Sequence, residues 1–476
     1  MASMKGHDTK NNTRRTTQHK KRNNLERGHA AEVSDISSRS PSTPLLFGAE
    51  GGHISQAFAP ATGTKLDAKS YGQLLERSSA LRDTRPAIYI HLPFCPSRCL
   101  SCDRHSVVTH TESSIDDYID DLDREMELYA ARLGEGTELA QIHLGGGTPN
   151  YLSEPQMLRL MSVIERYFKI VPETEMSLEA NPKRCSYAQL QLLYGLGFRD
   201  IKLQVRDLDA EVQLAIGRTN SAAILEDVCA NIRDIGFSVL SVDLVYGLPE
   251  QTTASITRTV QQLKALSPNR VTCSGFNRQA NRFMHQRALP FTRVPSLADG
   301  LILFNAVINS MEVDGYEWVG LESFMRADDR LAVAQHEQRL HRNWIGYNLH
   351  GSPTVLGFGA SAISEVGNGC VQNHNDVDAW RDTLRRGELP VRGGVLLNER
   401  EQAYRRAVND LFCNMQLDSA ESLCVSNEHQ DELDSLRKQG VVDIRDDRLA
   451  ITQEGRILLH HACSHAKREY SWAGGW

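Results

Sequence analysis

The chain has 476 residues, of which 40% are hydrophobic and 24% charged, and its formal net charge at neutral pH is −7. This length is enough for two or three domains, or for one large α/β barrel with a smaller domain. The negative charge argues against nucleic acid or an anionic membrane as the main partner. No apolar run approaches the ~18 residues that a membrane-spanning helix needs.

The first 30 residues differ from the rest, because they carry eight lysine and arginine side chains against only Asp8 and Glu26. They lack the apolar core of a secretory signal and the apolar face of a transit peptide. We interpret residues 1–60 as a disordered basic tail, for which a solvated state is favoured over the alternative of a tether to nucleic acid or membrane. We therefore expect a cytoplasmic, reducing location.

Ten cysteines occur in the chain, and three of them fall within eight residues. In a reducing compartment, clustered cysteines are metal ligands more often than disulfide partners.

From residue 87 onward, short apolar runs alternate with helix-length segments. The runs are Ala87–His91, Ala140–Leu144, Met176–Glu179, Asp200–Val205, Val239–Val245 and Arg270–Ser274. Strands that alternate with helices predict a parallel sheet with crossover helices. The fold class is therefore α/β, with a partial (β/α)6 TIM-like barrel over residues 61–300. Its chemistry should lie at the carboxyl ends of the strands.

After residue 300 the pattern becomes mostly helical. We expect residues 301–398 to form a helical, connecting extension that completes the active site. Residues 399–476 predict a helical, winged-helix-like domain, with a hairpin over Gly440–Ile444 and Arg448–Ile451 and a helix capped by Thr452. The acidic turn of the hairpin argues against DNA binding.

The most informative segment is the loop after the first strand, where Cys95, Cys99 and Cys102 have the spacing C-x3-C-x2-C. Three soft thiolates on one short loop can hold a [4Fe–4S] cluster and leave its fourth iron open. An open coordination position is what substrate binding at a catalytic metal requires. The alternative is a zinc site completed by His105, which a two-plus-two spacing would favour.

A second motif, Gly145–Pro149, follows the second strand. Glycines let a ligand approach the backbone closely and expose N–H donors. A triple glycine alone is weak evidence, because ordinary turns are also rich in glycine.

The cysteine spacing directly after the first strand resembles the radical S-adenosylmethionine superfamily, and the glycine motif is similar to its site for the methionine amino group. Residues 85–460 resemble one family within it, the oxygen-independent coproporphyrinogen III oxidases of haem synthesis. The motifs that carry this resemblance are Tyr89–Cys95, Gly145–Leu152, Ser177–Pro182, Asp243–Pro249, Asp328–Gln335, Leu340–Tyr347 and Leu356–Ser364.

The resemblance implies a [4Fe–4S] cluster on the three cysteines and one or possibly two molecules of S-adenosylmethionine. The implied reaction is oxidative decarboxylation of two propionate side chains of coproporphyrinogen III to vinyl groups, by a 5′-deoxyadenosyl radical. The implied partners are a tetrapyrrole substrate and an electron donor such as flavodoxin or ferredoxin. We expect a monomer that binds neither nucleic acid nor membrane.

The resemblance also implies the site residues. Tyr89 and His91 would be the catalytic pair, with His91 between cluster and cofactor, although a buried core histidine is nearly as common. The contacts of the first S-adenosylmethionine would be Tyr89, Gly146, Glu179 and Ile363. Those of the second would be Gly147, Thr148, Arg218 and Asp243.

Several positions depart from the family pattern. Ser101 replaces an aromatic residue, and Arg104 replaces a cysteine that follows the third ligand. Arg206 and Asn277 replace a glutamine and a small residue at the implied second cofactor site. Because Arg206 is a permanent cation, it would repel a sulfonium and favour a carboxylate.

Three hypotheses therefore remain open. The chain is an oxidative decarboxylase of coproporphyrinogen III, a divergent radical enzyme acting on another tetrapyrrole or other substrate, or a haem-binding carrier that keeps the fold.

Overall fold

The computed structural model describes residues 63–78, 84–134, 136–313, 315–419 and 427–465. The predicted basic tail lies outside these residues. Within them, no helix is long and apolar enough to cross a membrane.

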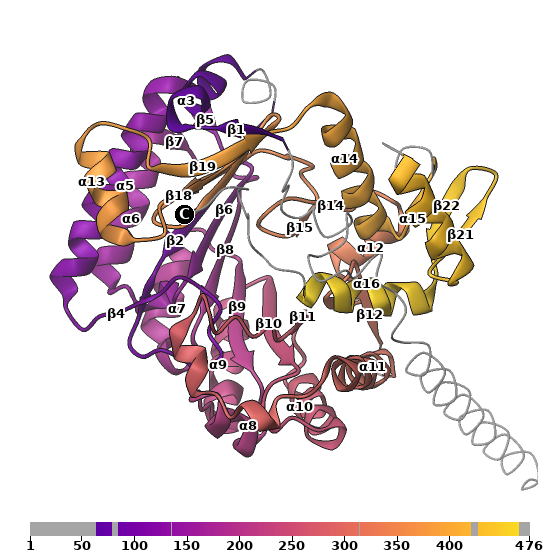
Figure 1. Cartoon of the computed structure of the whole chain (residues 1–476). Helices are drawn as coiled ribbons and strands as arrows, with labels where there is room; N and C mark the ends of the chain where they lie inside the picture. The colour runs from indigo at the N-terminus through magenta and orange to yellow at the C-terminus, as the bar shows by residue number, and fades with distance from the viewer. Residues whose placement is uncertain (1–62, 79–83, 135, 314, 420–426, 466–476) are drawn as a thin grey trace, which may run out of the picture. The chain divides into compact units, whose positions relative to one another are not determined.

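A parallel sheet forms the centre of the described chain (Figure 1). Its strands are β2 (Ala87–Leu92), β6 (Gln141–Gly146), β8 (Glu175–Ala180), β9 (Asp200–Arg206), β10 (Val239–Tyr246) and β11 (Arg270–Gly275). Each pairs in parallel with the next, in chain order. All six predicted strands are thus confirmed, and their carboxyl ends share one edge, as the barrel hypothesis requires.

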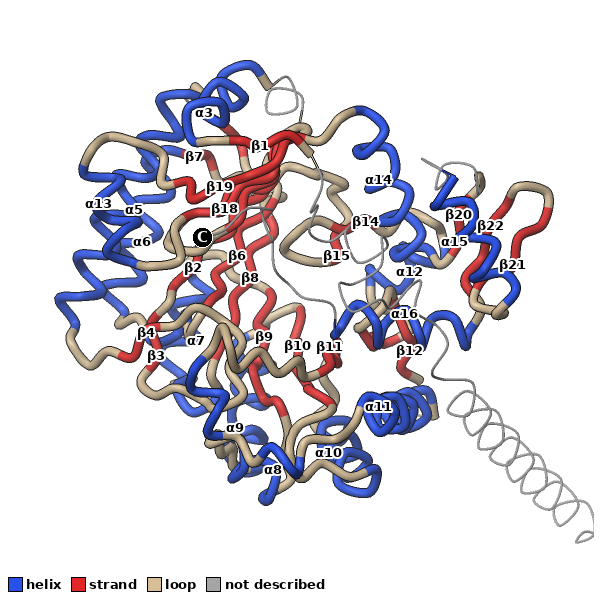
Figure 2. Tube along the Cα trace, viewed as in Figure 1, coloured by secondary structure: helices blue, strands red, loops and turns tan. Residues whose placement is uncertain are grey.

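Helices connect these strands, and Figure 2 shows them around the strands of the sheet. They are α5 (Glu112–Leu133), α6 (Glu154–Tyr167), α7 (Tyr187–Gly195), α8 (Ala210–Ala215), α9 (Ala222–Ile235) and α10 (Thr253–Ala265). The apolar stripe of α5 is buried and includes Tyr118, Leu122 and Met126. Short elements in the connections are β3 (Phe94–Cys95), β4 (Val107–Val108), β5 (Thr137–Glu138), β7 (Phe168–Lys169), η1 (Pro149–Tyr151) and η2 (Pro182–Arg184).

The expectation of a mostly helical segment after residue 300 was wrong. Helices α11 (Leu297–Glu312), α12 (Arg330–His336) and α13 (Val377–Arg385) are present, but strands lie between them. The strands are β12 (Tyr316–Val319), β13 (Ser323–Arg326), β14 (His341–Arg342), β15 (Tyr347–Asn348), β16 (Val355–Phe358), β17 (Ile363–Val366), β18 (Gly369–Asn373) and β19 (Val391–Leu396).

These later strands extend the central sheet at both edges. Strand β16 pairs in parallel with β2, and β17, β18, β19 and β1 (Thr64–Leu66) follow it in antiparallel order. At the opposite edge, β13 and β12 pair antiparallel beyond β11. Residues of β16, β17 and β18 are buried throughout, so the alternation that identifies a half-exposed strand is missing from their sequence.

The C-terminal segment contains the predicted hairpin. Its elements are α14 (Glu399–Asn414), β20 (Gln416–Leu417), α15 (Asn427–Lys438), β21 (Val442–Arg445), β22 (Arg448–Ile451) and α16 (Gln453–His465). Asp446 and Asp447 have positive φ angles of 51° and 64°, which suits a tight hairpin turn. Thr452 Oγ1 accepts the N–H of Gly455 at 2.9 Å and so caps α16 as expected. Two further 3-10 turns, η3 (Met284–Ala288) and η4 (Phe291–Arg293), precede α11.

Glu125 joins α5 to the added strands from inside the core. Its fully buried carboxyl accepts hydrogen bonds from Gly359 N (2.7 Å), Asn373 Nδ2 (2.7 Å) and Trp380 Nε1 (3.2 Å). Burial raises the pKa of Glu125 to about 8, although these donors oppose the rise.

This carboxyl should make stability fall as pH rises. Its pKa in the unfolded chain is about 4.3, below the value of about 8 in the fold. Its contribution is therefore complete below the unfolded value and is lost as pH increases toward the folded one. Between about pH 5.5 and pH 8, the free energy of unfolding of the wild type should fall by about 2–4 kcal/mol relative to that of Glu125→Gln, measured with urea. Parallel pH profiles for the two proteins would contradict this assignment.

Candidate active site

The three clustered cysteines lie on a loop that follows β2 and is anchored from distant parts of the chain. Leu100 N donates to Ile216 O at 2.9 Å. The Cys102 carbonyl accepts hydrogen bonds from His285 Nε2 (2.8 Å) and Gln286 Nε2 (3.0 Å). The short strands β3 and β4 pair in parallel and close the base of the loop. The loop backbone is therefore held in place by protein contacts.

Cys95, Cys99 and Cys102 are free thiols that line one cavity. Among the described residues, no three His, Cys, Asp or Glu side chains converge on a single metal ion. In a cluster each thiolate binds a different iron, so its ligands need not converge as those of one ion do. The zinc hypothesis is not supported, because the His105 ring instead lies 3.2 Å from Arg282 Nη2. Three soft donors without a fourth fit a [4Fe–4S] cluster with one open iron.

The triple glycine packs directly against the strand and loop that carry the cysteines. A Cβ atom would meet the Tyr89 ring at 2.7 Å from Gly145, Leu92 N at 2.9 Å from Gly146, and Pro93 O at 2.6 Å from Gly147. Gly146 also has a φ of +114°, which disfavours any other residue. The glycines thus allow β6 to approach the cysteine loop at backbone distance.

Tyr89 and His91 form a short hydrogen-bonded chain. His91 Nε2 donates to the His105 carbonyl at 2.9 Å, because a carbonyl can only accept. His91 Nδ1 is then free to accept from the Tyr89 hydroxyl at 3.2 Å. Burial lowers the pKa of His91 to about 4, so the ring is neutral near pH 7. His91 is therefore both buried, as the core alternative expected, and part of the cavity wall.

Glu179, at the end of β8, is the most strongly held carboxylate of the cavity. Its Oε2 atom accepts from Arg104 Nη1 at 2.7 Å and from Gln204 Nε2 at 2.8 Å, and His143 Nε2 lies 3.9 Å from Oε1. Burial alone would raise the pKa of Glu179, but Arg104, His143 and Lys202 outweigh it and hold the pKa well below its usual value. Arg104, which stands where the family pattern has a cysteine, is thus the ion-pair partner of Glu179, the carboxylate expected to contact S-adenosylmethionine.

The other predicted residues come from strand ends around the same space. Asp243 of β10 is buried and pairs with Lys202 Nζ at 3.3 Å. Arg218, which follows α8, donates to Gln204 O at 2.6 Å and contacts Cys99 Sγ at 3.5 Å. Arg218 is therefore an inward-facing side chain and not a helix-surface arginine.

One cavity of about 660 Å³ brings all the predicted site residues together. Its lining includes Tyr89, His91, Cys95, Cys99, Cys102, Gly146, Gly147, Thr148, Glu179, Arg206, Arg218, Asp243, Asn277 and Ile363. The family-specific segment near Tyr347 contributes Arg342–Ile345, and His460 comes from α16. Residues from the part of the chain after residue 300 and from the C-terminal segment therefore help to line the cavity.

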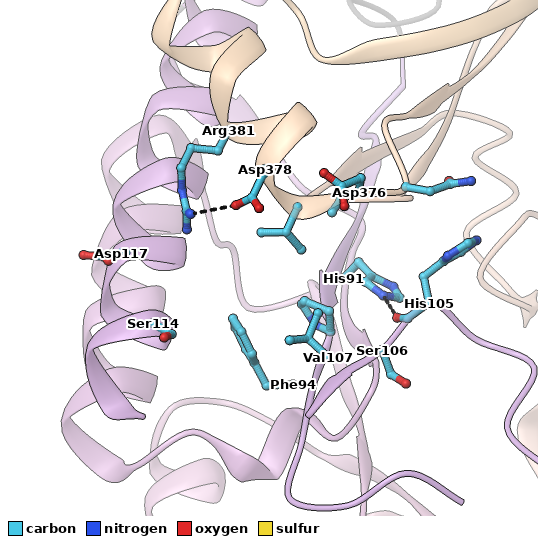
Figure 3. Close-up of a pocket in the computed structure, with 14 residues that line it drawn as sticks. His91, Phe94, His105, Ser106, Val107, Ser114, Asp117, Asp376, Asp378 and Arg381 are labelled. Atoms are coloured by element: carbon cyan, nitrogen blue, oxygen red, sulfur yellow. Dashed lines mark hydrogen bonds and ion pairs between the residues drawn. The ribbon is translucent and has the colours of Figure 1, made fainter. Parts of the chain in front are cut away.

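A smaller cavity of about 390 Å³ shares His91, His105 and Ser106 with the larger one. Figure 3 shows the hydrogen bond from His91 to His105 on one side and Asp378 with Arg381 of α13 on the other. Of the predicted site residues, only His91 lines this second space.

Sequence reasoning missed the partners that position Glu179. His143, Lys202 and Gln204 line the cavity, and the contact of Arg104 with Glu179 was not foreseen. A signal was available, because Lys202, Gln204 and Arg206 alternate with the apolar residues Ile201, Leu203 and Val205 along β9. Polar residues at every second position of a buried strand point to one interior face.

Comparisons with known proteins identify the relatives of this chain. The sequence profile of the Radical SAM superfamily matches residues 89–263. The oxygen-independent coproporphyrinogen III oxidase of Salmonella typhimurium is 32% identical over 385 residues, which cover 79% of this chain and 84% of that protein. The enzyme of the same name from Pseudomonas aeruginosa is 31% identical, with 81% of this chain and 87% of that protein covered.

Among solved structures, coproporphyrinogen III oxidase from Escherichia coli, described as a radical SAM enzyme, superposes with a TM-score of 0.78 at 30% sequence identity. The match covers 84% of this chain and 93% of that chain.

The close approach of Gly147 to the cysteine loop gives a direct test. In Gly147→Ala, the new Cβ should push the backbone of Pro93 and Phe94 away, at a cost of about 1–3 kcal/mol in unfolding free energy. The displaced loop should also hold less iron and sulfide after anaerobic reconstitution.

Gly195→Ala is the matched control, because no heavy atom lies within 4 Å of its Cβ. It should keep the wild-type iron content and stability. Equal iron content in both variants would show that the cysteine loop does not depend on this contact.

Proposed function

Because the chain belongs to the oxygen-independent coproporphyrinogen III oxidase family of the radical S-adenosylmethionine superfamily, we propose that it decarboxylates coproporphyrinogen III to protoporphyrinogen IX by 5′-deoxyadenosyl radical chemistry. The family is supported by a relative that is 32% identical and of which 84% is covered. A [4Fe–4S] cluster and S-adenosylmethionine follow from membership in the superfamily.

The observation that carries the proposed substrate is the charge of the cavity wall. Nine lysine and arginine side chains line it, against five aspartate and glutamate side chains. An excess of cations in an enclosed space attracts and orients an anion, and arginine matches a carboxylate in a bidentate fork. A tetrapyrrole with several propionate side chains has the charge and the carboxylate groups that such a wall recognises.

The cysteine loop would hold the cluster through Cys95, Cys99 and Cys102. When bound, the cluster supplies one electron to the sulfonium of S-adenosylmethionine. The N–H groups of the glycine motif and the carboxylate of Glu179 would orient that molecule beside the loop. His91 is neutral and keeps its proton on Nε2. Its ring would hold this part of the cavity wall in place without adding a charge.

A second candidate is a radical enzyme that acts on a different tetrapyrrole. The specific observation in its favour is Arg104, a departure from the family pattern whose guanidinium donates a hydrogen bond to Glu179. S-adenosylmethionine would have to share or displace this contact.

The test is an anaerobic assay with dithionite, S-adenosylmethionine and coproporphyrinogen III, in which 5′-deoxyadenosine and oxidised porphyrin products are measured together. We expect 5′-deoxyadenosine with mono- and divinyl products from the wild type, and neither from Cys99→Ala. Cys185→Ala, which removes a cysteine outside the cavity lining, should remain active.

Two other outcomes would contradict the proposal. If 5′-deoxyadenosine accumulates without any vinyl product, the enzyme acts on another substrate. If the protein binds haem stoichiometrically and forms no 5′-deoxyadenosine with a strong reductant, it is a carrier.

A further inference from the structure

Arg206 is the last residue of β9, at the carboxyl end of the parallel sheet and in the wall of the large cavity. Its φ angle is +77°, in the left-handed region that costs energy for any residue with a Cβ. Strained residues of this kind persist where the surrounding structure enforces them, often at ligand sites. The fold therefore holds the backbone of Arg206 in an unfavourable conformation at the carboxyl end of β9, in the wall of the cavity.

The pairing of β9 with β10 explains how the conformation arises. Asp243 pairs with Gln204, but Leu244 pairs with Arg206, so the register shifts by one residue at Val205. Such a bulge re-aims the side chain that follows it. Gln204 and Arg206 both line the cavity, although the bulge interrupts the regular pairing between them.

No hydrogen bond or ion pair joins the Arg206 guanidinium to another described residue, and its positive charge acts on the nearby Cys102 thiol. The neighbouring Asp207 is fully buried and accepts from Thr259 Oγ1 (2.7 Å), Gln251 Nε2 (2.6 Å) and Asp209 N (2.8 Å). It is therefore not available to neutralise Arg206.

The carboxylates of the cavity are also engaged elsewhere. Four of them form ion pairs with other cations: Glu179 with Arg104, Asp243 with Lys202, Glu322 with Arg342 and Glu365 with Arg405. The charge of Arg206 thus faces the cavity without a counter-ion from these groups.

Arg218 adds a second cation at the same strand end. It donates to the carbonyl of Gln204, two residues before Arg206, and its Nε atom is buried without a hydrogen-bond partner. A buried guanidinium donor that lacks an acceptor is costly. An anionic ligand at this position would accept from one or both arginines.

We propose that Arg206, assisted by Arg218, forms a carboxylate-binding subsite that holds one propionate-type side chain of the substrate. The identity of the ligand as a tetrapyrrole rests on the proposed function, whereas the preference for a carboxylate rests on the free guanidinium. A planar guanidinium binds a carboxylate in a fork that a lysine or a glutamine cannot reproduce. The same charge repels a sulfonium, so this position selects against a cationic ligand.

The first arm of the test measures binding of coproporphyrin III, the stable oxidised form of the proposed substrate, to the reconstituted protein. Arg206→Gln should weaken binding by about tenfold or more, and Arg206→Lys should give an intermediate loss. Arg385→Gln removes an exposed arginine of α13 outside the cavity and controls for net charge. It should leave the dissociation constant unchanged, and all variants should keep the wild-type iron content.

The second arm uses citrate, a small tricarboxylate, as a probe that does not depend on the tetrapyrrole. Citrate at millimolar concentration should protect Arg206 from phenylglyoxal, as followed by peptide mass spectrometry, while surface arginines react at an unchanged rate.

The two arms separate the failure of the subsite from the failure of the proposed function. Protection by citrate without binding of coproporphyrin III would uphold the carboxylate subsite and reject the tetrapyrrole. Equal affinity of wild type and Arg206→Gln for coproporphyrin III, or no protection by citrate, would overturn the subsite.

Discussion

The site depends on the absence of three side chains. Gly145 and Gly146 end β6 where it runs beside β2, and Gly147 follows them. A Cβ on any of the three would collide with β2 or with the cysteine loop. This approach seats the loop over the carboxyl ends of the parallel strands, where the residues that follow each strand converge. The ends of β2 and β6 meet at backbone distance. One cavity can therefore contain the cluster ligands, the carboxylate of Glu179 and the cations of β9.

Charge is the second constraint on the cavity. Glu179 is buried, and it stays ionised because Arg104, His143 and Lys202 outweigh the effect of burial on its pKa. Asp243 is compensated by Lys202 in the same way. Arg206 forms no ion pair with another described residue, and its charge favours an anionic ligand at this one end of β9.

The sequence was sufficient to predict the six parallel strands and the cysteine loop, because each lies at or just after a clear apolar run. The other predicted site residues followed from the family resemblance, and His143, Lys202 and Gln204 of the cavity lining were missed. The strands after residue 300 could not be predicted in this way. Segments such as Val355–Phe358 are short and buried on both faces, and what makes them strands is pairing with Ala87–Ile90, far away in the chain. The ion pair of Arg104 with Glu179 joins residues 75 positions apart, so no local pattern could reveal it.

The proposed chemistry requires the cysteine loop to hold a cluster with one open iron inside the cavity. Electron paramagnetic resonance of the dithionite-reduced, reconstituted protein tests it most directly, with spectra recorded before and after addition of S-adenosylmethionine. We expect a reduced [4Fe–4S] signal whose g-values shift when S-adenosylmethionine binds the open iron. A [4Fe–4S] signal that is identical with and without saturating S-adenosylmethionine would contradict the account.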